Sequence, residues 1–387
     1  MPACCTDDYM LHPGWFRRLD LHENQSQFAC RKTERVNAVN RIAVLIGLSV
    51  GLSGSAVQAS ILKPSGNIQS CLSFSAPYPG QLPEEISISN NYRETYLSDF
   101  DNYMHAYAIY LTAMSSQAVV SDQAADKLRD EIVSNAQRQP IRYNVSADTP
   151  PIFHVLLVAV PQALAYARDK ARYAPEEQAV VEAWLLKVIK DLQKDYALQK
   201  FKLDNKQYLF GVLMAAYGHA AGDKQMLNRA FKTYTTAIKG QRKDGSLPRD
   251  SGRGGSALHY SNQAVGNLVA LADVLGTAGI DAWGYQSGDK SIHSIIKFLL
   301  DATEDPELIA GHANDPDMRD ASFPGTSPTN QDRSWPNGEM ASWGHYYLKK
   351  FGKNENASRL FSMSPFLSSG RIGQPDGPYG NARCYAG

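Results

Sequence analysis

Residues 176–196 read EEQAVVEAWLLKVIKDLQKDY. Apolar side chains recur in this stretch at intervals of three and four residues, and charged side chains stand between them. This spacing collects the apolar side chains on one side of an α-helix and predicts an amphipathic helix with one buried face. Pro175 comes directly before the stretch, at the position where the first turn of a helix tolerates proline.

Segments of the same kind recur from residue 98 onward, and they share a turn of glycine, proline or aspartate at their ends. Strands with a period of two residues are scarce, and no strict repeat is visible. We therefore expect an all-α fold of antiparallel helix pairs, stacked as a solenoid or toroid. Pro161 is expected to kink or split one helix. The further predicted helices cover 100–115, 122–137, 152–170, 206–221, 224–240, 261–277, 289–302 and 338–351.

The N-terminal residues 1–59 are expected to lie outside the folded domain. Residues 42–59 read IAVLIGLSVGLSGSAVQA and follow Arg41, a pattern typical of a secretory signal that is cleaved after Ala59. A membrane anchor is the alternative, but the stretch is short and rich in glycine and serine. The residues before it are not needed by a signal, so we expect a true translation start further along, for example near Val36. The prediction is a periplasmic or secreted protein without a membrane segment after cleavage.

Cleavage there would leave two cysteines, Cys71 and Cys384, in the exported chain. Exported proteins usually pair such cysteines, so we expect one disulfide between the beginning and the end of the mature chain. Two unpaired buried thiols are the alternative. Residues 60–97 are rich in proline, serine, asparagine and glycine and are expected to form an extended lead-in. Residues 98–387 are expected to form one helical domain.

Composition limits the classes of function. Hydrophobic residues are 43% and charged residues 20% of the 387-residue chain, which excludes a disordered chain, a collagen and a multi-span membrane protein. Lysine plus arginine and aspartate plus glutamate both number 39, and this neutral balance argues against a nucleic-acid-binding protein. A local basic cleft for a polyanion remains compatible with it. The 20 tyrosines would suit a groove that holds sugars.

One candidate site segment lies at residues 204–208, which read DNKQY. Asp204 is a good N-cap, and Gln207 three residues later completes a capping-box pattern. Asn205 and Lys206 then fall in the first helical turn, where outward backbone N–H groups and the helix dipole favour an anion. An ordinary capped helix with a solvated Lys206 is the alternative.

A second candidate segment lies at residues 244–260, which read DGSLPRDSGRGGSALHY. Its glycines let the backbone approach a ligand, and Arg249 and Arg253 supply forked donors for carboxylates. No Lys-Ser/Thr pair follows the glycines and no strand precedes them, so a nucleotide-binding loop is not predicted.

Together the two segments resemble the alginate lyases of the (α/α)-toroid type. That family has an Asn-His-x-Tyr stretch, to which residues 205–208 are similar. It also has Asp-Gly-x-Leu-Pro, to which 244–248 are similar, then an arginine, and seven residues on a tyrosine within Ala-Leu-x-Tyr-x-Asn. Arg253 and Tyr260 keep this spacing. The likeness covers roughly residues 200–350 and depends on the linked pattern.

The resemblance implies an incomplete (α/α) toroid and a polysaccharide lyase that acts on an acidic polysaccharide by β-elimination. It implies that Tyr260 is the catalytic tyrosine, that Arg253 assists it, and that Asn205 neutralises the substrate carboxylate. Lys206 replaces the usual histidine and is counted with the catalytic residues. The family requires no cofactor, and we expect no metal and a monomer. Candidate substrate-binding residues are Tyr208, Arg249 and Trp335, the last of which could equally pack in the core.

The chemistry constrains the substrate. A tyrosine with an ordinary pKa near 10 needs nearby positive charge to act as a base, and Arg253 and Lys206 can supply it. In mannuronate and glucuronate the C5 proton and O4 lie on the same ring face, so one tyrosine can remove the proton and also protonate O4. In guluronate and galacturonate they lie on opposite faces, and a second group is needed. Lys206 in place of the family's histidine leaves the single-tyrosine route, so we expect a preference for mannuronate- or glucuronate-type linkages.

Two other functions remain open from the sequence. A glycoside hydrolase would need a pair of carboxylates, and the candidates are Asp204, Asp244, Asp250 and Glu339. A non-catalytic polysaccharide-binding protein would explain the loss of the family's histidine. A metal site at His312 with Asp315 and Asp317 is a weaker alternative to a plain polar loop.

Overall fold

The computed structural model describes residues 60–64, 68–72, 75–84, 99–142, 152–198, 203–313, 331–368 and 382–386. All of them belong to one compact unit, Ala56–Gly387. The expected export signal and its cleavage site fall outside the described residues. Within these ranges, no helix combines the length and the apolar character needed to cross a bilayer.

The described secondary structure is helical, apart from isolated β-bridges such as Ser60–Lys63 and Ser287–Lys290. Every helix predicted from the sequence is present, although the last one is shorter than expected and begins after two turns of 3₁₀-helix. The long helices are α3 Asp99–Ala118, α4 Asp122–Arg138, α5 Ile152–Asp169, α6 Pro175–Leu198, α7 Asn205–Ala221, α8 Lys224–Gly240, α10 Ala257–Thr277 and α11 Ile292–Glu304. The shorter ones are α1 Ile68–Leu72, α9 Pro248–Ser251, α12 Glu307–Ala313, α13 Trp343–Phe351, α14 Glu355–Met363, α15 Pro365–Ser368 and α16 Ala382–Ala386. The 3₁₀ turns are η1 Lys170–Arg172, η2 Gly254–Ser256, η3 Trp335–Asn337 and η4 Glu339–Ala341.

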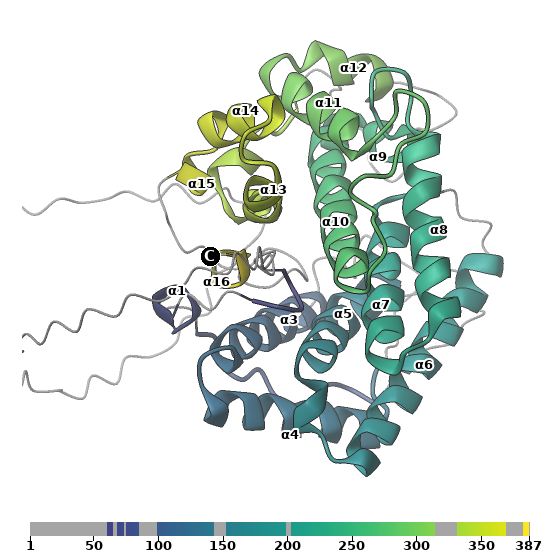
Figure 1. Cartoon of the computed structure of the whole chain (residues 1–387), viewed down its shortest axis with the longest axis vertical. Helices are drawn as coiled ribbons and strands as arrows, with labels where there is room; N and C mark the ends of the chain where they lie inside the picture. Colours follow the sequence, from purple (N-terminus) through teal and green to yellow (C-terminus); the bar gives the residue numbers. More distant parts are fainter. Residues whose placement is uncertain are drawn as a thin grey trace, which may run out of the picture. The chain divides into compact units, whose positions relative to one another are not determined.

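Neighbouring helices pack in pairs, as Figure 1 shows. Helix α3 packs against α4 and α5, and α7 packs against α5, α8 and α10. The buried face of α6 is the one that the sequence predicts, with Val181, Leu185 and Ile189 fully enclosed. The predicted all-α class is therefore confirmed, and the central α7 and α10 carry the candidate site.

Helix α5 runs without interruption from Ile152 to Asp169 with Pro161 inside it. The expectation that this proline splits the helix was wrong. Proline removes one backbone hydrogen bond and crowds the preceding turn, which destabilises an isolated helix. Here α5 is buried from residue 154 to residue 166, so packing on the surrounding helices outweighs the local penalty.

The described part of the lead-in is packed more closely on the helices than its composition suggests. It contains the helix α1, and Ile61 and Leu62 are buried. The Ile61 N–H donates to Asp273 Oδ2 at 2.8 Å, and the hydroxyls of Ser60 and Thr277 lie 3.0 Å apart. Side chains near the end of α10 thus fix the start of the described chain.

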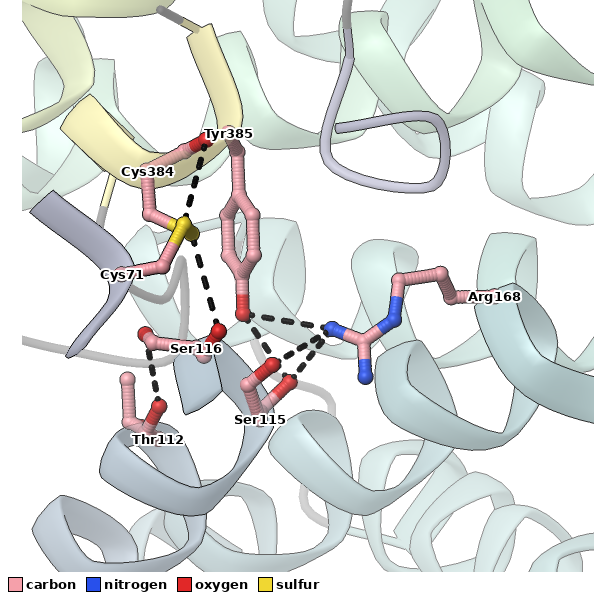
Figure 2. Close-up of a disulfide and its surroundings, with 7 residues drawn as sticks. All are labelled: Cys71, Thr112, Ser115, Ser116, Arg168, Cys384 and Tyr385. Atoms are coloured by element: carbon pink, nitrogen blue, oxygen red, sulfur yellow. Dashed lines mark hydrogen bonds between the residues drawn. A yellow bond between two sulfur atoms is a disulfide. The ribbon is translucent and has the colours of Figure 1, made fainter. Parts of the chain in front are cut away.

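A disulfide joins Cys71 on α1 to Cys384 on α16, the pair that the sequence suggested (Figure 2). The neighbouring Tyr385 hydroxyl lies 2.9 Å from Ser115 Oγ, and Arg168 Nη1 donates to the Ser115 carbonyl at 2.9 Å. The disulfide thus joins α16 to α1, the Tyr385 hydroxyl joins α16 to α3, and Arg168 joins α5 to α3.

We expect the double variant Cys71→Ser, Cys384→Ser to lose about 2–5 kcal/mol of unfolding free energy. The bond spans 313 residues, so its removal releases a very long loop in the unfolded chain. Urea unfolding of the variant and of the oxidised chain measures the difference, and the reduced wild type is the matched control. Equal midpoints for all three would contradict the expectation.

Candidate active site

The start of α7 is held by two carboxylates. Asp204 Oδ1 accepts the backbone N–H groups of Lys206 and Gln207 at 3.1 and 3.3 Å. Asp250 Oδ1 accepts the Asn205 N–H at 3.0 Å. The predicted N-cap is present, but the expectation of an anion site on these backbone groups was wrong, because protein carboxylates already occupy them.

The Asp-Gly segment at 244–248 serves to anchor the loop. Gly245 has φ +95°, and a Cβ atom there would collide with the backbone carbonyl of Ser294 on α11. Asp244 accepts the Ser246 N–H at 2.9 Å and lies 2.6 Å from His312 Nε2 on α12. The family-like motif therefore fixes on α11 and α12 the loop that carries Arg249 in α9 and Arg253 directly before η2.

Arg253 joins the two candidate segments. Its Nη2 lies 3.2 Å from Asp204 Oδ2, and its Cζ lies 4.2 Å from the centre of the Tyr260 ring. The Arg253 side chain is only 6% exposed, so both interactions operate away from bulk water. The fold thus brings the N-cap of α7 and the first turn of α10 together around one guanidinium.

Asp250 lies near Arg253 and Asp204, and its protonation state affects the charge of the site. Burial and the neighbouring Asp204 raise the pKa of Asp250 to about 8, although Arg253 and the Asn205 N–H act in the opposite direction. Asp250 is therefore largely protonated at neutral pH, and Asp204 is the carboxylate that the described part of the site places within ion-pair distance of Arg253. An arriving substrate carboxylate therefore does not face negative charge on both Asp204 and Asp250.

The raised pKa of Asp250 has a consequence for stability. The folded chain holds a proton there that the unfolded chain releases above about pH 4, so stability falls as the pH rises from there through about 8. Asp250→Asn keeps an oxygen for the Asn205 N–H and does not titrate. Urea unfolding at a series of pH values should show a flatter decline in this variant. Burial also raises the pKa of Asp273 to about 7. Its contribution to stability falls with pH in the same way in both chains, so it cancels in the difference between them. Parallel curves would contradict the expectation.

Asn205 is 4% exposed and is fixed on three sides. Its Nδ2 donates to Gln263 Oε1 at 2.8 Å, and its carbonyl accepts from Asn267 Nδ2 at 2.8 Å. Gln263 Nε2 in turn lies 3.0 Å from His259 Nε2. Neither Gln263 nor Asn267 was predicted from the sequence. Polar amides within the apolar pattern of 261–277 were the signal that could have revealed them.

Buried amides also hold the start of α10. Gln331 Oε1 accepts the Leu258 N–H at 3.0 Å, and Gln331 Nε2 donates to the Gly254 carbonyl at 2.8 Å. Asn262 Oδ1 accepts from Trp343 Nε1 at 2.9 Å. These bonds join α10 to η2, α13 and the segment before η3, and they determine where the candidate tyrosine lies.

Two predicted substrate-binding residues are core residues. Tyr208 is 2% exposed, and burial together with Asp250 and Asp204 raises its pKa well above the ordinary value. Trp335 is also 2% exposed, and its Nε1 donates to Thr303 Oγ1 at 2.9 Å. Neither ring can serve as an exposed platform for a sugar, because almost none of either side chain is accessible to solvent. Arg249 on α9 and Lys206 on α7 are partly exposed and remain available to a ligand.

Three of the four carboxylates proposed for a hydrolase have structural roles in the fold. Asp204 and Asp250 do converge, but they are 3% and 0% exposed and cap α7. Asp244 is paired with His312. Asp315 and Asp317 lie outside the described residues, within which no cluster of three potential metal ligands is found.

Comparison with known proteins places residues 90–309 in the alginate lyase family, a range that includes Asn205, Arg253 and Tyr260. A polysaccharide lyase of Stenotrophomonas maltophilia (strain K279a) is 27% identical over 150 residues, 39% of this chain and 45% of the relative. An alginate lyase of Pseudomonas syringae pv. syringae (strain B728a) is 26% identical over 138 residues, 35% and 36% of the two chains. The matched segment thus spans less than half of these curated relatives.

Solved structures resemble the chain over a larger share. Alginate lyase A1-III from Sphingomonas species A1 superimposes with a TM-score of 0.63 at 18% identity, covering 82% of this chain and 87% of that one. A tyrosine-to-phenylalanine variant of A1-III complexed with tetrasaccharide gives 0.65 at 17% identity, covering 84% and 92%. An alginate lyase from Bacteroides ovatus gives 0.53 at 14% identity, covering 86% and 89%. The likeness confirms the predicted (α/α)-toroid fold.

Proposed function

The chain belongs to the alginate lyase family, and from this premise we propose that it is a polysaccharide lyase that cleaves a uronate-containing polysaccharide by β-elimination. The observation that carries the proposal is the position of Arg253. Its guanidinium lies 4.2 Å from the centre of the Tyr260 ring and is tied to the start of α7, where Asn205 begins the helix. A base, a cation and a carboxylate-binding amide are the groups that this reaction needs.

The reaction begins with the weakly acidic proton at C5 of the uronate. Asn205 and the partly exposed Lys206 would bind the neighbouring carboxylate and so stabilise the negative charge that develops when this proton leaves. The Tyr260 phenolate would accept the proton, since the guanidinium of Arg253 stabilises negative charge on the ring. Tyr260 would then donate the proton to O4 as the glycosidic bond breaks, leaving a double bond between C4 and C5.

The substrate class follows from the number of groups available. A single tyrosine can serve a uronate whose C5 proton and O4 share one ring face, as in mannuronate and glucuronate. Lys206 stands where the family usually has histidine, so no second acid or base of that kind is supplied from α7. The proposal is therefore a preference for mannuronate- or glucuronate-type linkages.

The proposed place of action is the periplasm or the exterior of the cell. The signal-like residues 42–59 support export. The disulfide between Cys71 and Cys384 suits an oxidising compartment. In that compartment the enzyme would meet acidic polysaccharides as polymers.

The test is the ultraviolet absorbance of unsaturated uronate ends. The chain is incubated with polymannuronate, polyguluronate, glucuronan and hyaluronan. We expect absorbance to rise on polymannuronate or glucuronan, and to rise more slowly on polyguluronate. Equal rates on polymannuronate and polyguluronate would contradict the single-tyrosine route. New reducing ends without absorbance would indicate a hydrolase, and affinity without either product would indicate a binding protein.

A further inference from the structure

Three side chains form a continuous chain of hydrogen bonds that ends beside Tyr260. Asn205 Nδ2 contacts Gln263 Oε1 at 2.8 Å, and Gln263 Nε2 contacts His259 Nε2 at 3.0 Å. The His259 ring meets the Tyr260 ring edge to face, with centroids 5.2 Å apart. His259 and Gln263 lie one turn apart on α10, so the chain links α7 to the helix that carries the tyrosine.

The far end of this chain has an unsatisfied atom. Asn205 Oδ1 is buried and has no hydrogen-bond partner. A buried carbonyl oxygen without a donor destabilises the fold by about 1–3 kcal/mol. This atom belongs to the side chain that should contact the substrate carboxylate. A carbonyl oxygen and a carboxylate repel each other, so the amide in this orientation is wrong for its ligand.

The three side chains can also form the same hydrogen bonds with donors and acceptors exchanged. The two ends of an asparagine or glutamine amide have nearly the same shape, and a neutral imidazole can carry its proton on either nitrogen. When His259 Nε2 bears the proton, it donates to Gln263 Oε1. Gln263 Nε2 then donates to Asn205 Oδ1, and the Asn205 Nδ2 group turns to where the unsatisfied oxygen was. No heavy atom needs to move beyond the two amide rotations.

We infer that His259 and Gln263 are positioning residues that set the direction of the Asn205 amide, so that a proton on His259 Nε2 presents the Asn205 NH₂ group to a uronate carboxylate. The inference rests on the proposed lyase function, which it deepens by naming how the carboxylate is recognised. An amide donor that meets a carboxylate out of contact with water makes a charge-assisted bond, and the wrong orientation excludes the ligand.

The surroundings of His259 suit this role. Burial lowers the pKa of its imidazole and Arg253 acts in the same direction, while Asp332 opposes them. The ring is therefore neutral at neutral pH and has one proton to place on either nitrogen. A permanently charged ring would hold one direction only and could not respond to the arrival of a ligand.

The test uses affinity for a mannuronate tetrasaccharide, measured by calorimetry in the Tyr260→Phe chain so that turnover does not interfere. His259→Leu and Gln263→Leu should each weaken binding by about tenfold to a hundredfold. His259→Gln should bind like the parent, because its amide can donate to Gln263. Equal losses in His259→Leu and His259→Gln would overturn the inference, and so would unchanged affinity in both leucine variants.

A second measurement separates positioning from a general structural role. Residues that act only through Asn205 should have no further effect once that side chain is removed. In an Asn205→Ala background, His259→Leu should therefore leave the residual affinity unchanged. A further tenfold loss there would show that His259 acts by another route and would overturn the inference.

A third measurement does not depend on the substrate. Nitrogen-15 NMR reports which ring nitrogen of His259 carries the proton, and it is recorded without ligand for the parent, Gln263→Leu and Asn205→Ala. If the hydrogen bonds are coupled as inferred, both substitutions shift the His259 signals, although Asn205 lies at the far end of the chain of hydrogen bonds. Unchanged signals would overturn the inference, whereas absence of unsaturated product on every polymer would remove only the proposed function.

Discussion

The variant Tyr260→Phe is expected to lose about 10²- to 10⁴-fold or more of the lyase rate, which is the usual contribution of a positioned acid or base. The substitution removes only the hydroxyl, which is the group proposed to take the C5 proton and return it to O4. The ring remains, so its packing under Arg253 at 4.2 Å is retained. Folding and affinity should therefore be close to those of the parent.

The measurement is the initial rate of absorbance increase on the preferred polymer, together with the melting temperature and the affinity for an oligosaccharide. A matched control is Tyr285→Phe. Tyr285 is a partly exposed tyrosine on the turn before α11, in edge contact with Phe231. Turnover that survives in Tyr260→Phe at the parental rate would remove the proposed base. A loss of equal size in Tyr285→Phe would point to a general effect on the fold.

The variant Arg253→Ala is expected to lose both activity and stability. Removal of one partner from a buried ion pair leaves the other charge uncompensated, and such losses amount to about 3–5 kcal/mol. Asp204 would be left with the buried Asp250 beside it and no cation within contact in the described part of the site. The Tyr260 ring would also lose the guanidinium that lies 4.2 Å from its centre.

Arg253→Lys separates these two effects. A lysine keeps the positive charge but lacks the planar group that stacks on a ring while it pairs with a carboxylate. We expect urea unfolding to show partial recovery of stability, with activity still well below the parental rate. Full activity in Arg253→Lys would contradict the proposal that the geometry of the guanidinium matters. Unchanged stability in Arg253→Ala would contradict the assigned ion pair with Asp204.

Local pattern was sufficient to predict most of the helices. The buried face of α6 follows from a spacing of three and four residues, and the N-cap at Asp204 follows from residue type and position. Both depend on neighbours within one or two turns, which the sequence displays directly. The prediction that Pro161 splits its helix was wrong, because the effect of this proline depends on the packing around α5, which involves residues distant in sequence.

In the candidate site, too, some features could be predicted from the sequence and others could not. The identities of Arg253 and Tyr260 and their spacing were evident in the sequence, whereas the burial of Trp335 was not. An aromatic side chain in a polar segment can line a groove or fill a core, and only its neighbours decide which. For Trp335 the neighbours are Thr303 and the stacked ring of Trp343, which come from α11 and α13.

The sequence by itself determined the helical class, the residue types of the site and the pair of cysteines. Those features follow from periodicity and from chemistry that each side chain carries wherever it lies. Only the tertiary structure decided that Asp204 is the partner of Arg253, that Asp250 holds its proton, and that Gln263 connects Asn205 to His259. Pairing, pKa and hydrogen-bond direction depend on distance and on exclusion of water, and both are set when α7 and α10 pack together.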